Sequence, residues 1–300
     1  MMTSLARSSC RAGLAAAVLA GALLAWVERL PASAPEGRPD SEGLQERAAA
    51  PTLDARLDSG SVQQVQLHLV DRALADLQPS EPGSRQVFFV GFAGFGPGAV
   101  FKREVVAVQR LFDDRFGTKG RSVALINHVS TVDEVPLASL PNLERVLQHL
   151  GRIMDASRDT LFLFLTSHGE RAVLAVEMQG VDLAHLTPPL LKAVLDRSGI
   201  KNSVIVVSAC HSGSFIPALA GPRTLVIAAA RADRTSFGCA DHREWTYFGE
   251  AYFNRALREE TSFKRAFKRA KQLIEGWEVK EKLLPSLPQM VGGEALALID

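Results

Sequence analysis

The sequence contains only three cysteines in 300 residues: Cys10, Cys210 and Cys239. Because Cys10 falls in an N-terminal targeting pattern, the folded part keeps two, which are too few for a disulfide scaffold. They also lack the paired spacing of a zinc ribbon, so no structural metal site is predicted. A single bridge between Cys210 and Cys239 stays open from the sequence, and it would block thiol chemistry at both residues.

An excess of charge of either sign is also missing. The chain has 34 Lys and Arg against 33 Asp and Glu, which gives a formal net charge of +1. A protein without a basic excess cannot neutralise many phosphates, so nucleic acid is not predicted as a partner. Internal repeats are absent, and a hydrophobic content of 47% is that of a globular chain able to bury a core of useful size.

The N-terminal apolar run, residues 12–27, is shorter than the roughly 20 residues that span a bilayer comfortably. Arg7 and Arg11 precede this run, and the small residues 32–34 (Ala-Ser-Ala) follow it. A basic start, a short apolar stretch and a small-residue cleavage site predict a secretory signal peptide over residues 1–34. A retained membrane anchor is the alternative. Both interpretations place the bulk of the protein outside the cytoplasm, either periplasmic or secreted.

The rest of the chain divides by composition. Residues 35–60 are rich in Pro, Ala, Ser, Gly and charges and predict a disordered linker, and residues 61–84 predict an amphipathic helix and a connector. Residues 85–300 predict one folded domain, in which short strands apolar on both faces alternate with helices. Such strands belong to an α/β fold whose mainly parallel sheet is covered by helices on both faces. Strands are expected near 86–92, 122–126, 160–166, 203–207 and 224–229, and helices near 101–116, 140–154, 188–196, 245–258 and 262–274.

Two of the predicted strands end in reactive residues. The strand at 160–166 runs into Ser-His-Gly, with His168 in the middle, and the strand at 203–207 runs into Ser-Ala-Cys-His-Ser-Gly, with Cys210 third. Ligands of open α/β sheets bind beyond the carboxyl ends of the strands, and consecutive parallel strands are often neighbours. The pattern therefore predicts an imidazole and a thiol on the same edge of the sheet, as a cysteine nucleophile requires.

The glycines beside these residues suit the same chemistry. Gly169 permits close approach of backbone to a substrate carbonyl, and its N–H with that of Cys210 could form an oxyanion hole. Ser212 and Gly213 open a helical stretch after Cys210, which predicts that the thiol lies near a helix N-terminus, where thiolate is favoured.

Other chemistries fit the sequence less well. The glycines at 91, 94 and 96 have the spacing G-x-x-G-x-G, which is not the dinucleotide fingerprint, and the next strand ends without an acidic residue. His128, His149 and His185 have no partner at metal-ligand spacing. Neither a dinucleotide site nor a metal site is therefore predicted from these residues.

Several segments resemble the legumain-like, or C13, cysteine peptidases of the larger caspase-like group. The main ones are FLFLTSHG at 162–169 and VIVVSACHSGSF at 204–215, which look like the family's His-Gly and Ala-Cys-x-Ser-Gly blocks. Further segments resemble bacterial members: FVGFAGFG, GRSVALIN, AARADRTSFGC and TYFGEAYF. The resemblance extends from about residue 85 to the carboxyl end.

The resemblance implies a caspase-like three-layer α/β fold, with His168 and Cys210 as a catalytic dyad that hydrolyses peptide bonds of a polypeptide partner. It implies that Arg103, His211, Ser236 and Asp241 lie where the family binds its substrate. Plant and animal members cut after asparagine and carry an acidic residue directly after the catalytic cysteine. Here that position is His211, so asparagine preference is not expected to carry over.

Two rival functions remain open at this stage. The same acyl-enzyme could pass its acyl group to an amine, as in the transamidases and ligases of the resembling group. The fold could also serve as a non-catalytic binding module, which the altered residue His211 would allow, although His168, Gly169 and Cys210 are all present.

Overall fold

The computed structural model describes residues 59–296, and the predicted signal peptide or anchor and nearly all of the linker lie outside them. Within this range none of the helices combines the length and apolarity that a bilayer span needs. The N-terminal elements are α2 (Ser59–Ala75), β1 (Val87–Ala93), α3 (Ala99–Arg115), β2 (Ser122–Ile126), α4 (Leu140–Ile153), β3 (Thr160–Thr166), β4 (Gly169–Glu170) and β5 (Val173–Leu174). The others are α5 (Pro188–Ser198), β6 (Ser203–Ser208), the 3₁₀ turn η1 (Ser212–Phe215), α6 (Ile216–Leu219), β7 (Thr224–Ala228), α7 (Tyr247–Gly249), the π-helix η2 (Glu250–Ala256), α8 (Leu257–Glu259), α9 (Phe263–Glu281) and β8 (Gln289–Gly292).

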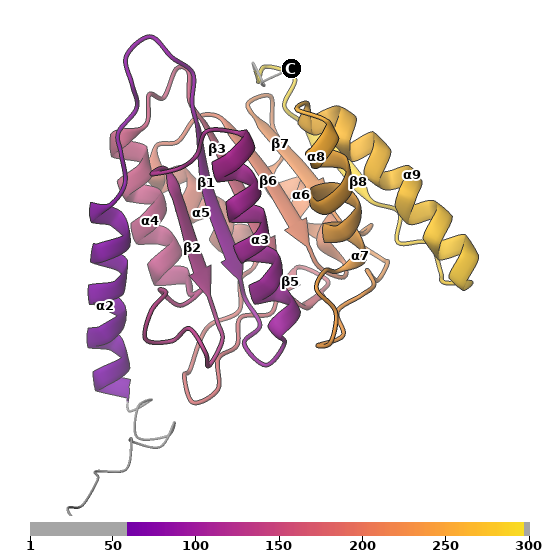
Figure 1. The fold of residues 1–300 in the computed structure, drawn as a ribbon, viewed down its shortest axis with the longest axis horizontal. Helices are drawn as coiled ribbons and strands as arrows, with labels where there is room; N and C mark the ends of the chain where they lie inside the picture. The colour runs from indigo at the N-terminus through magenta and orange to yellow at the C-terminus, as the bar shows by residue number, and fades with distance from the viewer. Residues whose placement is uncertain (1–58, 297–300) are drawn as a thin grey trace, which may run out of the picture. The chain divides into compact units, whose positions relative to one another are not determined.

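Six strands form the main sheet in the order β2-β1-β3-β6-β7-β8 (Figure 1). The first five are parallel, and β8 pairs antiparallel with β7. The prediction of a mainly parallel α/β sheet is confirmed. The antiparallel edge strand was not predicted, because its four residues carry only a weak strand pattern.

Alternate residues of the strands face two separate hydrophobic layers. On one face Phe89 and Phe162 pack with α3, η2 and α9. On the other face Phe88 and Leu161 pack with α4, α5 and α6. Since successive side chains of a strand point to opposite faces, strands buried on both sides must be apolar throughout. The expected three-layer arrangement is therefore present.

The helix predicted at 245–258 is present as one continuous helical segment, in which α7, η2 and α8 follow each other without a gap. Thr246 caps α7 by accepting a hydrogen bond from the Gly249 N–H at 3.0 Å, and the chain then widens into the π-helix η2. π-helical turns inside helices often accompany functional sites. Helical periodicity cannot distinguish an α-turn from a π-turn, since both bury the same apolar residues.

The amphipathic helix predicted after the linker is present as α2 and begins at Ser59. It packs through Leu69 and Val70, which are buried, and the Gln66 side chain donates to the Val132 carbonyl at 3.2 Å. The division at residue 85 between this helix and the predicted peptidase domain stays a prediction.

Candidate functional site

The strands β3 and β6 are neighbours, and their last residues, Thr166 and Ser208, lie opposite each other in the sheet. The Ser167 N–H donates to the Ser208 carbonyl at 3.3 Å and so extends the pairing. His168 and Cys210 each lie two residues beyond this pair. The prediction that both motifs leave the same edge of the sheet on adjacent strands is confirmed.

Two phenylalanines enclose the His168 ring. Its centroid lies 4.6 Å from that of Phe95, which follows β1, and 5.1 Å from that of Phe101 in α3, both in edge-to-face geometry. Burial lowers the pKa of His168 below its usual 6.5, and the nearby carboxylate of Glu177 opposes the shift. A half-buried imidazole of this kind is neutral at physiological pH, so it is able to accept a proton.

Cys210 and Cys239 are both free thiols, so the bridge left open by the sequence is absent. The Cys210 sulfur accepts a hydrogen bond from the Ser236 N–H at 3.3 Å and lies 3.5 Å from the Ser236 carbonyl oxygen. Ser236 was predicted to bind substrate, and it reaches the sulfur through its backbone. Burial, with contributions from the Cys210 and Glu104 groups, raises the pKa of Cys239 to about 12. We therefore expect Cys239 to stay protonated at neutral pH and to react slowly with alkylating agents.

Gly169 lies directly against the backbone of Cys210. A Cβ placed at residue 169 would lie 2.5 Å from the Cys210 carbonyl oxygen and 3.0 Å from the Ala209 Cβ. Gly169 pairs with Leu174 in the β4–β5 hairpin, while the Ala175 N–H donates to the His168 carbonyl at 3.0 Å. This pattern makes Gly169–Leu174 the non-hydrogen-bonded kind of pair, so the Gly169 N–H points away from β5.

The short helical stretch predicted after Cys210 is present and begins at Ser212. The predicted helical stretch is the 3₁₀ turn Ser212–Phe215 followed by the four-residue α6, too short for a strong helix dipole at the thiol. The Gly213 N–H donates to the Ala230 carbonyl at 2.8 Å. His211 adopts a left-handed conformation, with φ of 57°, and its Nδ1 lies 3.1 Å from the Ala232 carbonyl oxygen. The His211 ring is thus held by the loop after β7.

Arg103 and Asp241, predicted to bind substrate, lie beside each other. The Arg103 guanidinium donates to the backbone carbonyls of Asp241 and Arg243, and it forms an ion pair with Glu244 at 3.5 Å. The Asp241 carboxylate accepts the Ala99 N–H at the start of α3 at 2.7 Å. Both side chains hold the 241–244 loop against α3, and their roles toward a substrate stay predictions.

Sequence reasoning missed Glu104, a fully buried residue of α3. Its carboxylate accepts the Thr166 hydroxyl at 2.7 Å, and both the Thr246 N–H, at 2.8 Å, and the Thr246 hydroxyl, at 2.7 Å. The signal was available: Glu104 lies between Phe101 and Val105 on the apolar stripe of its helix. A charged residue in that position is rare unless hydrogen bonds satisfy it.

Glu104 carries a testable pH dependence. Burial raises its pKa from 4.5 to about 6, although the hydrogen bonds from Thr246 and Thr166 oppose the shift. The folded state therefore binds the proton more tightly than the unfolded state, and stability from this group is present below pH 4.5 and lost as pH rises through 6. We expect the free energy of unfolding of Glu104→Gln, relative to that of the wild type, to increase by about 2 kcal/mol as the pH rises from about 4 to about 7.5. Urea denaturation of both proteins measures this gain, and a difference independent of pH would contradict it.

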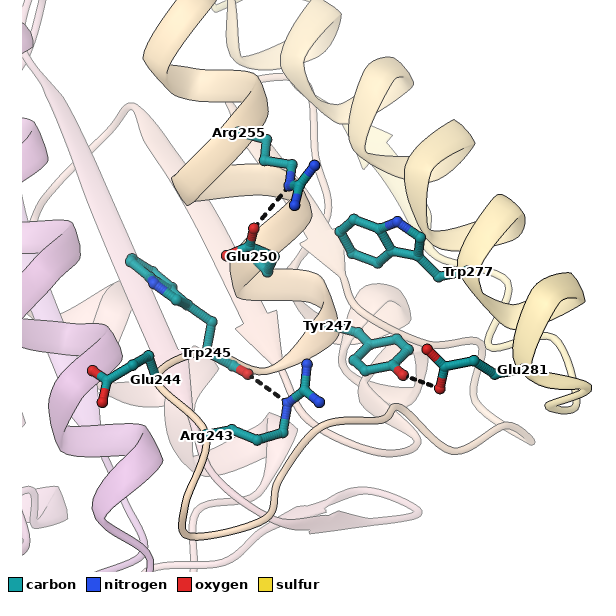
Figure 2. A pocket seen from close by; sticks show the side chains of 8 residues that line it. All are labelled: Arg243, Glu244, Trp245, Tyr247, Glu250, Arg255, Trp277 and Glu281. Atoms are coloured by element: carbon teal, nitrogen blue, oxygen red, sulfur yellow. Dashed lines mark hydrogen bonds and ion pairs between the residues drawn. The ribbon is translucent and has the colours of Figure 1, made fainter.

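A pocket of about 350 Å³ lies on the α7–α9 side of the molecule (Figure 2). One ion pair lies within the pocket, Arg255 with Glu250 at 2.8 Å, and the Tyr247 hydroxyl donates to Glu281. Arg255 also lies over the Trp277 ring, 5.3 Å from its centroid. The lining contains neither His168 nor Cys210, although two of its residues, Arg243 and Glu244, contact Arg103. It is lined by Arg243, Glu244, Trp245, Tyr247, Glu250, Arg255, Trp277 and Glu281.

Of the comparisons with known proteins, the match to a family model supports a cysteine-peptidase type of function. No curated protein matches the chain. Among solved structures, caspase-1 from Spodoptera frugiperda is similar at 12% identity, covering 72% of this chain and 92% of the caspase chain, with a TM-score of 0.48. The model of the peptidase C13 family matches residues 141–296, a range that contains both strand-end motifs. Because this match covers just over half of the 300 residues, the protein belongs to the peptidase C13 family.

Proposed function

We propose that the protein is a cysteine endopeptidase with Cys210 as nucleophile and His168 as acid and base. The observation that carries the proposal is the register of β3 and β6, which places the two residues at equivalent positions beyond paired strand ends. Membership of the C13 family supports a cysteine-peptidase type of function. The half-buried His168 and the free Cys210 thiol supply the groups that the reaction needs.

In the proposed reaction His168 accepts the thiol proton while the Cys210 sulfur attacks the scissile carbonyl carbon. The oxyanion that forms is stabilised by the N–H groups of Gly169 and Cys210. His168 then returns the proton to the leaving amine, the C–N bond breaks, and a thioester remains on Cys210. Water, deprotonated by His168, attacks the thioester, which releases the acid and restores the thiol. No metal or organic cofactor takes part.

A peptide library tests this proposal together with selective alkylation. The wild-type protein should cleave a subset of peptides, and iodoacetamide should abolish cleavage while mass spectrometry locates the label on Cys210. Cys239 is the internal control: its pKa of about 12 keeps it protonated, so it should label at least about 10-fold more slowly. Cleavage that survives full labelling of Cys210 would contradict the proposal. An added amine that appears in the product would identify transfer instead of hydrolysis, and an intact library with slow labelling would favour a binding module.

A further inference from the structure

A buried hydrogen-bond network connects the two strand ends that precede His168 and Cys210. At its centre is the Glu104 carboxylate, which is inaccessible to solvent. One oxygen accepts the Thr166 hydroxyl, from the last residue of β3, at 2.7 Å. The other accepts the N–H and the hydroxyl of Thr246 at 2.8 Å and 2.7 Å. The network therefore joins α3, the end of β3 and the start of α7.

The same network extends to β6 through Thr246. A threonine hydroxyl has one proton to donate and two lone pairs that accept. The Thr246 hydroxyl donates to Glu104, so its oxygen is left to accept from the Gly249 N–H at 3.0 Å and from the Ser208 hydroxyl at 3.4 Å. Ser208 is the last residue of β6. Since Thr166 and Ser208 face each other in the sheet, one carboxylate is connected to both strand ends.

We propose that Glu104 is a positioning residue, which acts through Thr166 and Thr246 to fix the ends of β3 and β6 and so hold His168 and Cys210 in reacting geometry. This inference rests on the proposed function, because it assigns a purpose to the geometry of that dyad. A buried carboxylate is costly, and all three of its donors are neutral groups, so no opposite charge offsets the cost of burying it. The burial that raises the pKa of Glu104 to about 6 reflects that cost.

The network matters for catalysis because reacting atoms tolerate little displacement. A misplacement of about 1 Å can reduce a rate by about 100-fold. When the carboxylate is ionised, both threonine hydroxyls must point toward it, which fixes their rotamers. In a neutral amide one of the two acceptor oxygens is replaced by an NH2 donor, so the hydroxyl that faced that oxygen can no longer donate to residue 104 and must rotate. The rotamers of Thr166 and Thr246 are then no longer fixed by a common acceptor.

The test compares Glu104→Gln, Thr166→Val and their double variant, with Thr166→Ser as the conservative rescue. We expect each single substitution to lower kcat by about 10-fold and to leave KM within about twofold. The double variant should be no slower than the singles, because both remove the same connection. Thr166→Ser keeps the hydroxyl and should retain nearly wild-type kcat. The alkylation rate of Cys210 by iodoacetamide, measured in every variant, should fall in step with kcat.

Val108→Ala is the matched control, since Val108 is a buried apolar residue one turn further along α3. It should lower the melting temperature and leave kcat unchanged. A Thr166→Val protein that loses stability in the same way but keeps its kcat and alkylation rate would overturn the inference. The inference would also fail if the losses of kcat in the two single variants multiplied in the double variant. If the wild type cleaves no peptide, the proposed function fails. The alkylation rates still decide the inference: slower labelling of Cys210 supports it, and unchanged labelling overturns it.

Discussion

Replacing Cys210 with alanine is expected to reduce kcat for peptide cleavage by on the order of 10⁴-fold or more, because the atom that forms the thioester is removed. His168→Ala should reduce kcat by on the order of 10³-fold, since the thiol then has no positioned base and the leaving amine has no acid. The two losses should not multiply in the double variant, because both residues act in one step. Steady-state kinetics on a peptide from the library measure all three variants.

The matched controls for the dyad are Cys239→Ala and His149→Ala. Cys239 is the second cysteine of the folded part, and its protonated thiol cannot replace the nucleophile. His149 lies in α4, in the layer on the other face of the sheet. Both controls should keep kcat within about twofold of the wild type. A Cys210→Ala protein that keeps its activity, or a Cys239→Ala protein that loses it, would show that the nucleophile has been assigned wrongly.

Gly169→Ala is expected to lower kcat by about 100-fold or more while the sheet remains folded. A Cβ at this position would lie 2.5 Å from the Cys210 carbonyl oxygen, a backbone atom, so the two segments must separate. That separation moves the proposed oxyanion donor of residue 169 and the segment that carries the nucleophile at once. Kinetics with circular dichroism and thermal melting distinguish loss of geometry from loss of fold.

Gly276→Ala is the control for this substitution. Gly276 lies in α9, and a Cβ there would meet nothing within 4 Å. The change should leave kcat unaltered and raise stability by about 0.5–1 kcal/mol, because alanine favours the helix over glycine. If Gly169→Ala turned over peptide as fast as Gly276→Ala, the close contact between the two strand ends would have no part in catalysis.

Some of the fold follows from the sequence with little error. The strands predicted at 122–126 and 160–166 have those bounds in the structure, because residues buried on both faces of a sheet must be apolar without interruption. Most helix ends in this domain were predicted within two residues, but α9 extends to Glu281, seven residues beyond its predicted end at 274. The helix predicted at 245–258 is present at 247–259, and only its π-helical middle was not predicted, because apolar periodicity does not report the backbone hydrogen-bond pattern.

The candidate site was predictable only in part. His168 and Cys210 were identified because each directly follows a strand of apolar residues. The buried network behind these two residues was not predicted. Glu104 and Thr246 are 142 residues apart in the chain, and nothing local to either indicates the other. Equally, the enclosure of His168 by Phe95 and Phe101 depends on how α3 packs against the end of β1.

The sequence by itself determined that this chain forms a covered, mainly parallel sheet and that an imidazole and a thiol follow two of its strands. These properties depend on the pattern of apolar residues and on residue type, and both can be read from short segments of the sequence. Tertiary structure alone decided that Thr166 and Ser208 lie opposite each other, that Ser236 approaches the sulfur through its backbone, and that one buried carboxylate connects both strand ends. Register and contact between distant segments arise from packing the whole core, so no single segment contains them.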